Sequence, residues 1–388
     1  MLYSMLASAA VVLCGLDVLV RSDFHALKGR KIGLICNHTT RTRDGRHAID
    51  VFAQTPGVEL KALFAPEHGI RGDKDEHITD EKDAKTGLPV YSLYNLKAQG
   101  LARYTPDPKQ LDGLDTLVFD IQDIGARFYT YTSTMGFAME AAAQRKMRFV
   151  VLDRPNPIGG VEVEGAVADP EYRGATSYHP LPTRHGMTAG ELALYFKAQR
   201  KLDVDLEIIK VEGWKRSMWW DETGLEWINP SPNMRSLNAA ALYTGICLIE
   251  AGNISVGRGT DDPFERIGAP YIKGMELAER FNALNLPGIK AYPVRFTPDP
   301  TKFAGVECQG LGFSITDRAK LRPVRMGFEL ARLIHQLYPE YQEETLVRLV
   351  QNKAASEATI KLDKRTPAAW SKGVAEFKKA RVPFLLYN

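Results

Sequence analysis

The sequence has few cysteines and lacks several common catalytic and nucleotide-binding motifs. Its 4 cysteines form no CxxC pair, which argues against a zinc ribbon or a thioredoxin-type site. It contains no GxGxxG turn, no GxxxxGK[ST] loop, no HExxH pair and no GxSxG elbow. These absences argue against a dinucleotide-binding enzyme, a P-loop NTPase, a zincin metalloprotease and an α/β-hydrolase with a serine nucleophile.

Excess charge and long apolar runs are also missing. The 50 Lys and Arg residues nearly balance the 47 Asp and Glu residues, which argues against a nucleic-acid partner. The apolar stretch at 2–13 is too short to span a bilayer, so we expect no membrane span. No basic residue precedes Arg21, as a secretory signal would require, so the stretch is a signal remnant, a misassigned start or a docking helix.

The chain does contain a repeated pattern of short apolar runs followed by helical stretches. Four short, largely apolar runs, at 31–36, 60–65, 116–120 and 148–153, three of which contain β-branched residues, indicate strands buried on both faces of a parallel sheet. The 388 residues exceed one ordinary core, so we expect an α/β lobe at 15–180 and a smaller, mixed α+β lobe at 181–388.

Polar side chains follow each of these four runs, and they are listed here in chain order: Asn37 and His38; Glu67 and His68; Asp120, Gln122 and Asp123; Asp153 and Arg154. In an open parallel sheet, ligands bind beyond the carboxyl ends of the strands. A glycosidase needs an acid and usually a second carboxylate. Because neighbouring strands are about 5 Å apart, Glu67 and either Asp120 or Asp123 could form that pair. The same histidines and carboxylates could alternatively bind a metal.

Several longer motifs resemble one family. They are Asn37–Thr39, Ala65–Gly72, Thr86–Tyr94, Val118–Tyr131, Leu152–Pro157, Arg184–Thr188, Pro230–Met234, Gly257–Thr260 and Pro263–Glu265. In this order they resemble the NamZ-type exo-β-N-acetylmuramidases, long catalogued as a domain of unknown function. One departure is His38-Thr39, where relatives commonly carry Gln-Thr, which makes His38 a weak catalytic candidate.

This resemblance implies a Rossmann-like lobe, a smaller C-terminal lobe and an active-site cleft between them. It further implies release of N-acetylmuramic acid (MurNAc) from the non-reducing end of β-1,4-linked MurNAc-GlcNAc, in cell-wall turnover or recycling, with no cofactor. The partner would be a peptidoglycan-derived saccharide. Such a substrate suggests an extracytoplasmic or periplasmic location, and the poor N-terminal signal leaves a cytoplasmic one open.

We assign roles on physical grounds. Glu67 is the first choice for general acid, because burial after a strand would raise its pKa, and His68 would orient it. Asp120 and Asp123 are candidates for the second carboxylate, and Glu164 is a reserve. The lactyl carboxylate of MurNAc calls for a guanidinium, for which Arg127, Arg258 and Arg71 are candidates. Further expected substrate contacts are Asn37, Gln122, Tyr129, Tyr131, Asn156, Asn233 and Glu265.

Two functions from other classes fit the same residues. A non-catalytic muropeptide- or sugar-binding protein would bind fragments and release no sugar. A metal-dependent hydrolase using the His, Asp and Glu set would be inactivated by a chelator.

Overall fold

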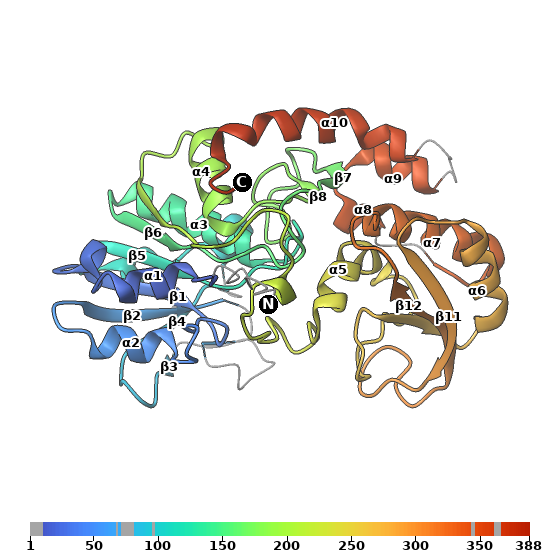
Figure 1. Ribbon diagram of the computed structural model, residues 1–388, viewed down its shortest axis with the longest axis horizontal. Coiled ribbons are helices and arrows are strands. Elements are labelled where there is room, and N and C mark those ends of the chain that lie inside the picture. The colour runs from blue at the N-terminus through green and yellow to red at the C-terminus, as the bar shows by residue number, and fades with distance from the viewer. Residues whose placement is uncertain (1–10, 67–68, 71–80, 95–97, 343–345, 361–365) are drawn as a thin grey trace, which may run out of the picture.

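The computed structural model describes residues 11–66, 69–70, 81–94, 98–342, 346–360 and 366–388 (Figure 1). A seven-stranded sheet forms the core of the N-terminal lobe. Parallel pairing joins six of its strands: β1 (Lys31–Cys36), β2 (Glu59–Ala65), β4 (Pro89–Ser92), β5 (Thr116–Asp120), β6 (Arg148–Leu152) and β9 (Asp205–Ile209). The short β3 (Glu81–Lys82) adds an antiparallel edge. The expected parallel sheet is confirmed.

The strand order is β3-β4-β2-β1-β5-β6-β9. Counted along the chain, the six parallel strands therefore follow the order 3-2-1-4-5-6 of dinucleotide-binding α/β folds, although the glycine fingerprint is missing. The order reverses between β1 and β5, where Cys36 pairs with Asp120 in the register. Loops leaving these two strands diverge to opposite faces, which opens a crevice at their carboxyl ends.

Helices cover both faces of this sheet. On one face, α1 (Gly15–Arg21) and α2 (Ala48–Gln54) pack on side chains such as Leu34 and Val150. On the other face, α3 (Tyr131–Gln144) and α4 (Ala189–Gln199) pack on Phe119 and Phe149. Successive residues of β5 and β6 alternate between the two cores, which explains their continuous apolar sequence.

The C-terminal lobe contains a three-stranded antiparallel sheet. Its strands are β10 (Arg266–Ala269), β12 (Cys308–Ile315) and β11 (Ile289–Phe296), in that order. Its helices are α5 (Leu237–Ile246), α6 (Gly274–Ala283), α7 (Pro323–Leu337), α8 (Leu346–Val350) and α9 (Lys353–Ile360). The expected smaller α+β part is confirmed. The expected domain boundary at 180/181 stays a prediction, and strand β9 of the large sheet follows it in the chain.

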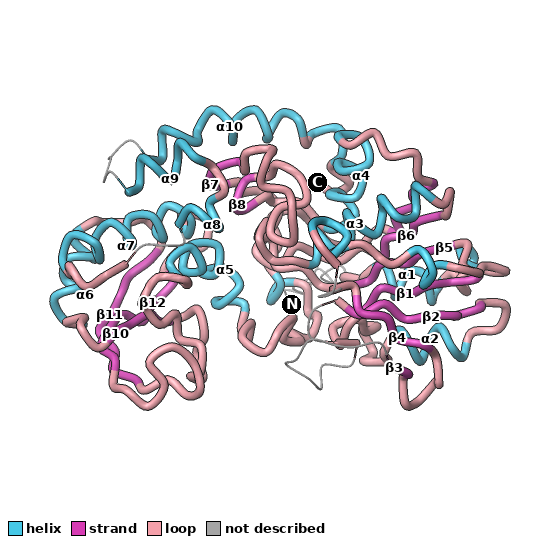
Figure 2. Tube along the Cα trace, turned by 180° about the vertical axis from the view of Figure 1, so that it is seen from behind, coloured by secondary structure: helices cyan, strands magenta, loops and turns pink. Residues whose placement is uncertain are grey.

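A small antiparallel pair, β7 (Glu164–Val167) and β8 (Pro182–Arg184), lies between the two lobes together with α10 (Thr366–Ala380). Figures 1 and 2 both show α10 running from the C-terminal lobe back across the N-terminal lobe. The helix α10 therefore spans both lobes.

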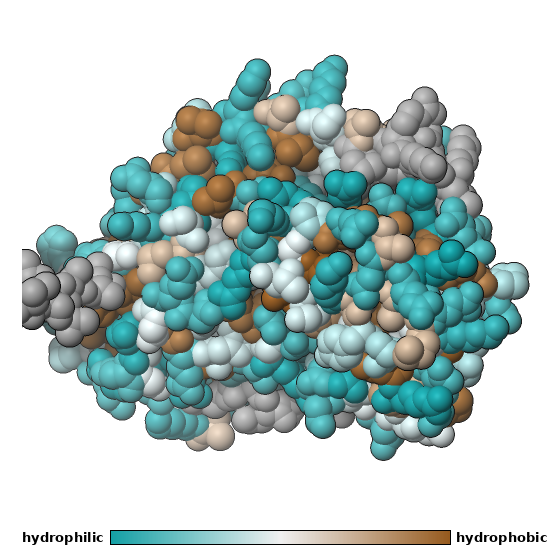
Figure 3. Space-filling model, turned by 45° about the vertical axis from the view of Figure 1, so that its right-hand side comes forward, coloured by the Kyte–Doolittle hydropathy of each residue, from teal (hydrophilic) through white to brown (hydrophobic). Residues whose placement is uncertain are grey.

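Hydrophilic residues cover most of the face drawn in Figure 3. In the described part of the chain, no helix combines the length and the apolarity that crossing a bilayer requires.

Candidate active site at the carboxyl edge of the sheet

Asp120 ends β5 at the point where the strand order reverses, and its side chain is fully buried. The Arg154 guanidinium, from the loop after β6, donates from Nε to Oδ1 and from Nη2 to Oδ2, the second at 3.0 Å. Burial alone would lower the pKa of Arg154, but the Asp120 charge outweighs it and raises that pKa well above its usual range. Asp120 and Arg154 therefore form a buried ion pair at the base of the crevice.

Asp123 lies three residues further along the same loop and is 8% exposed. Its Oδ2 accepts the Gly125 N–H at 2.7 Å. Gly125 has a φ of +84°, and a Cβ there would lie 2.6 Å from Asn156 Oδ1, so glycine is needed for this turn. Oδ1 of Asp123 is buried and has no hydrogen-bond partner among the described residues. Asp123 therefore has an acceptor oxygen that the described residues leave open.

His185 faces this carboxylate from the segment after β8. Its Nδ1 accepts the Met187 N–H at 3.2 Å, so Nε2 must carry the proton of the neutral ring. Nε2 lies 3.6 Å from Asp123 Oδ2, slightly beyond a hydrogen bond. The Nε2–H thus faces the carboxylate and can support its negative charge.

Two amide side chains complete this edge. Asn37 Oδ1 accepts the Thr39 N–H at 2.9 Å, and Gln122 Nε2 donates to the Asp123 and Pro155 carbonyls at 2.7 and 2.9 Å. The opposite ends, Asn37 Nδ2 and Gln122 Oε1, are buried without a hydrogen-bond partner in the described part of the chain. Buried polar atoms are rarely left unpaired, so both are candidates for ligand contacts.

Aromatic rings pack behind the loop that carries Asp123. The Tyr129 ring makes edge-to-face contacts with Tyr131 and Tyr243, with centroids 5.0 and 5.7 Å apart. The Tyr131 hydroxyl donates to the Pro230 carbonyl at 2.6 Å. Both Tyr129 and Tyr131 are less than one-tenth exposed, so their rings support the loop, and their predicted contacts with a sugar stay a prediction.

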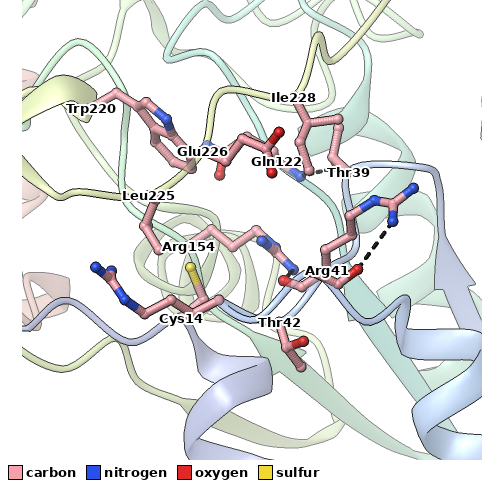
Figure 4. A pocket seen from close by; sticks show the side chains of 12 residues that line it. Cys14, Thr39, Arg41, Thr42, Gln122, Arg154, Trp220, Leu225, Glu226 and Ile228 are labelled. Atoms are coloured by element: carbon pink, nitrogen blue, oxygen red, sulfur yellow. Dashed lines mark hydrogen bonds between the residues drawn. The ribbon is translucent and has the colours of Figure 1, made fainter.

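A small pocket opens at the crevice between the ends of β1, β5 and β6 (Figure 4). Thr39, Arg41 and Thr42 line one side, and Trp220, Leu225 and Glu226 line the other. Gln122 and Arg154 also contribute, and Figure 4 shows the Arg154 side chain between Leu225 and Arg41. We call this cavity the switch-point pocket. The expected cleft between the lobes stays a prediction.

The structure places two predicted site residues in joints between parts of the molecule. Glu164 accepts the backbone N–H groups of Val324 and Arg325 at the start of α7, at 3.2 and 2.7 Å. Arg127 is 1% exposed and donates to the Leu349 and Val350 carbonyls at 2.6 and 3.0 Å. Burial lowers the pKa of Arg127 to about 9. These bonds favour structural roles for both side chains.

The remaining predicted residues are spread more widely. Asn156 is at the edge, where its Nδ2 donates to the Met187 carbonyl at 3.0 Å. Asn233 is half-buried just after Pro230. Arg258 pairs with Glu250 at 2.6 Å, and Glu265 accepts the Ser236 hydroxyl, both in the C-terminal lobe. Glu67, His68 and Arg71 lie outside the described residues.

The structure adds Arg41, which the sequence reasoning did not single out, to the pocket, and it places His185 beside Asp123. His185 had a signal, because it stands in the Arg184–Thr188 motif, but no spacing rule brings it to Asp123. Within the described ranges, no three His, Cys, Asp or Glu side chains are grouped so that they could hold a metal ion.

Fold and site together define a two-lobed α/β protein with a carboxylate-bearing candidate site at the strand-order reversal of a Rossmann-like sheet. Residues 32–238 match the family "Exo-beta-N-acetylmuramidase NamZ, N-terminal", and residues 241–387 match its C-terminal counterpart. The chain belongs to the NamZ exo-β-N-acetylmuramidase family.

Individual relatives agree with this membership. The chain is 42% identical over 382 residues to the peptidoglycan β-N-acetylmuramidase NamZ of Bacillus subtilis, covering 96% of this chain and 91% of that one. Two crystal structures of DUF1343 family proteins from Bacteroides fragilis are similar. Their TM-scores are 0.89 and 0.77 at 35% and 28% identity, and each comparison covers 97% of this chain and 99% of the other.

Proposed function

We propose that this protein is an exo-acting β-N-acetylmuramidase that releases MurNAc from the non-reducing end of β-1,4 MurNAc-GlcNAc fragments in peptidoglycan turnover. The observation that carries the proposal is the 42% identity to a peptidoglycan β-N-acetylmuramidase over 96% of the chain. It fits the chemistry of the edge, where Asp123 offers a carboxylate oxygen without a partner among the described residues.

In the proposed reaction, Glu67 protonates the glycosidic oxygen as the bond to the GlcNAc leaving group breaks. Asp123 serves as the second carboxylate. It either stabilises the oxocarbenium-like centre or polarises the 2-acetamido group of the substrate, which then acts as nucleophile. Asp120 is excluded from both roles in this scheme, because Arg154 occupies both of its oxygens.

The direct test is incubation of the purified chain with MurNAc-GlcNAc disaccharide, with and without EDTA, followed by identification of the products. We expect free MurNAc and GlcNAc in both reactions. Binding without release of sugar over long incubation would instead identify a saccharide-binding protein. Loss of activity with EDTA would identify a metal-dependent hydrolase.

We also propose an extracytoplasmic or periplasmic location, because the substrate is cell-wall material. Cell fractionation of a strain that expresses the full-length protein tests this. Recovery of the activity with the cytoplasmic fraction alone would overturn it and indicate recycling of imported fragments.

A further inference from the structure

The switch-point pocket is lined by three arginines, Arg41, Arg43 and Arg154. Arg41 donates to the His38 and Gly45 carbonyls at 3.3 and 3.1 Å, and Arg43 donates to the Val12 and Thr223 carbonyls at 3.1 and 3.4 Å. Among the described residues, neither forms an ion pair with a carboxylate. Their positive charges are therefore uncompensated at the mouth of the pocket.

Arg154 lies deeper and is 6% exposed. Its Nε and Nη2 are used by Asp120 and by the Arg41 carbonyl, which leaves Nη1 without a hydrogen bond among the described residues. Asp120 holds this guanidinium in place, so the free nitrogen loses little side-chain entropy when it binds a ligand. A fixed donor on a largely buried side chain is what recognition of a small anion requires.

Two further buried atoms lack partners at the same place. Gln122 Oε1 and Trp220 Nε1 form no hydrogen bond within the described ranges, and both residues line the pocket while less than one-tenth exposed. The exposed Glu226 is the opposing charge on the rim, where solvent screens it. The pocket therefore combines a net positive charge with unpaired donor and acceptor atoms.

The pocket is also correctly placed for the proposed reaction. Gln122 lines the pocket, and the next residue is Asp123, the proposed second carboxylate. The Cα atoms of these two residues are therefore about 3.8 Å apart. The lactyl ether of MurNAc stands on C3 of the ring, two ring bonds from the anomeric carbon. A group that binds the lactyl carboxylate must therefore lie beside the reacting carboxylates but separate from them.

We propose that the switch-point pocket binds the lactyl carboxylate of MurNAc, with Arg154 Nη1 as the buried contact and Arg41 and Arg43 at the mouth. This inference rests on the proposed function and assigns its substrate selectivity. It replaces Arg127 and Arg258, whose guanidinium groups are engaged elsewhere.

The test uses three chromogenic β-glycosides: MurNAc, its lactyl methyl ester and GlcNAc. Wild-type protein should hydrolyse the MurNAc glycoside with a kcat/KM about ten to a hundred times higher than the ester, because a charge-assisted hydrogen bond is lost with the ester. Arg41→Gln and Arg43→Gln should lower kcat/KM for the acid by about tenfold or more, mainly through KM, and leave the ester unchanged. The decrease in kcat/KM caused by the arginine substitutions and the decrease caused by esterifying the substrate should therefore be non-additive.

Three more variants sharpen the result. Arg46→Gln, an exposed arginine of the same loop that pairs with Asp44, should behave as wild type. Glu226→Gln should lower KM for the acid alone, because a repulsive charge is removed. Arg154→Lys keeps a charge for Asp120 but loses Nη1, so it should lose the preference for the acid. Because this variant could unfold, its melting temperature is measured too, and the mouth variants test the proposal independently.

Equal hydrolysis of acid and ester by the wild type, or an equal loss of both in the mouth variants, would overturn the inference while leaving the proposed function intact. If the wild type releases no MurNAc from the disaccharide, the proposed function itself fails.

Discussion

Asp120 and Asp123 are three residues apart in one loop, yet their surroundings differ. Asp120 is 0% exposed and bonded to Arg154 through both oxygens. Asp123 has one oxygen on a backbone N–H and one without a partner among the described residues. A carboxylate that is already ion-paired with a buried arginine is a poor reaction partner, whereas an unpaired carboxylate can interact with the substrate.

The matched pair Asp120→Asn and Asp123→Asn tests this difference. Asp120→Asn leaves the Arg154 charge buried without compensation, so we expect the free energy of unfolding to fall by about 3–5 kcal/mol. Asp123→Asn keeps an oxygen for the Gly125 N–H, so we expect nearly unchanged stability and a loss of about a hundredfold or more in kcat. Urea unfolding measures the stability of each variant, and turnover of the MurNAc glycoside measures its kcat. Normal activity of Asp123→Asn would remove that carboxylate from the mechanism.

Glu67 remains the predicted general acid. Glu67→Gln should keep the melting temperature and lower kcat by about 10²–10⁴-fold, because the amide cannot protonate the leaving oxygen. The loss should be smaller for a glycoside whose leaving group needs no protonation, such as a nitrophenolate. Retained hydrolysis of the disaccharide would exclude Glu67.

The sequence predicted that polar residues would gather at the carboxyl edge, because strand ends are readable from apolar runs. It did not predict which of them are engaged in structure. Asp153 follows β6 like the others, but it accepts the Tyr387 hydroxyl from 234 residues away and the Thr188 hydroxyl at 2.7 Å. Such partners arise from tertiary folding and leave no local pattern.

Individual strands also differ in whether the sequence predicts them. The apolar runs of β1, β2, β5 and β6 were predicted because burial on both faces makes them continuous. Strand β4 was not predicted, since only Val90 among its four residues is buried. The pair β7 and β8 was also missed, because the two strands are only four and three residues long.

Glu164 at the start of β7 connects this pair to α7, and its titration should be visible in stability. Burial raises its pKa from 4.5 to about 7, despite the N–H groups of Arg325 and Val324 that favour the charged form. The folded protein therefore retains the proton to a higher pH than the unfolded chain. The resulting stabilisation is complete below pH 4.5 and is lost as the pH rises through about 7, by about 3 kcal/mol in total.

We therefore expect the unfolding free energy of the wild type to fall relative to that of Glu164→Gln as the pH rises through that range, because glutamine does not titrate. Urea unfolding at several pH values measures it, with the exposed Glu307→Gln as control. Parallel pH profiles of wild type and Glu164→Gln would contradict the assignment.

Over the whole molecule, the chain returns to its first lobe after completing the second. Arg381, just after α10, donates to the His185 and Gly186 carbonyls at 3.0 and 2.7 Å and to the Gly160 carbonyl at 3.2 Å. The Leu386 N–H and the Tyr387 hydroxyl then bond to Glu191 and Asp153. The segment that carries His185 is thus fixed by residues almost 200 positions later.

Arg381→Ala should destabilise the N-terminal lobe. Each buried carbonyl that loses its donor costs about 1–3 kcal/mol, so we expect a loss of several kcal/mol and faster amide exchange around Gly160 and Gly186. Lys378→Ala, an exposed position on α10, is the matched control. If amide exchange became faster only in the C-terminal lobe, the contacts of Arg381 would not stabilise the N-terminal lobe.

The return of residues 381–387 also bears on biosynthesis. The seven strands of the large sheet are complete within the first 209 residues, but the side chains that fasten the loops around β6 and His185 are synthesised only after the second lobe. The candidate site at the carboxyl edge would therefore mature only after residues 381–387 have been synthesised. A nascent chain stalled in the second lobe should carry a formed sheet without a working enzyme.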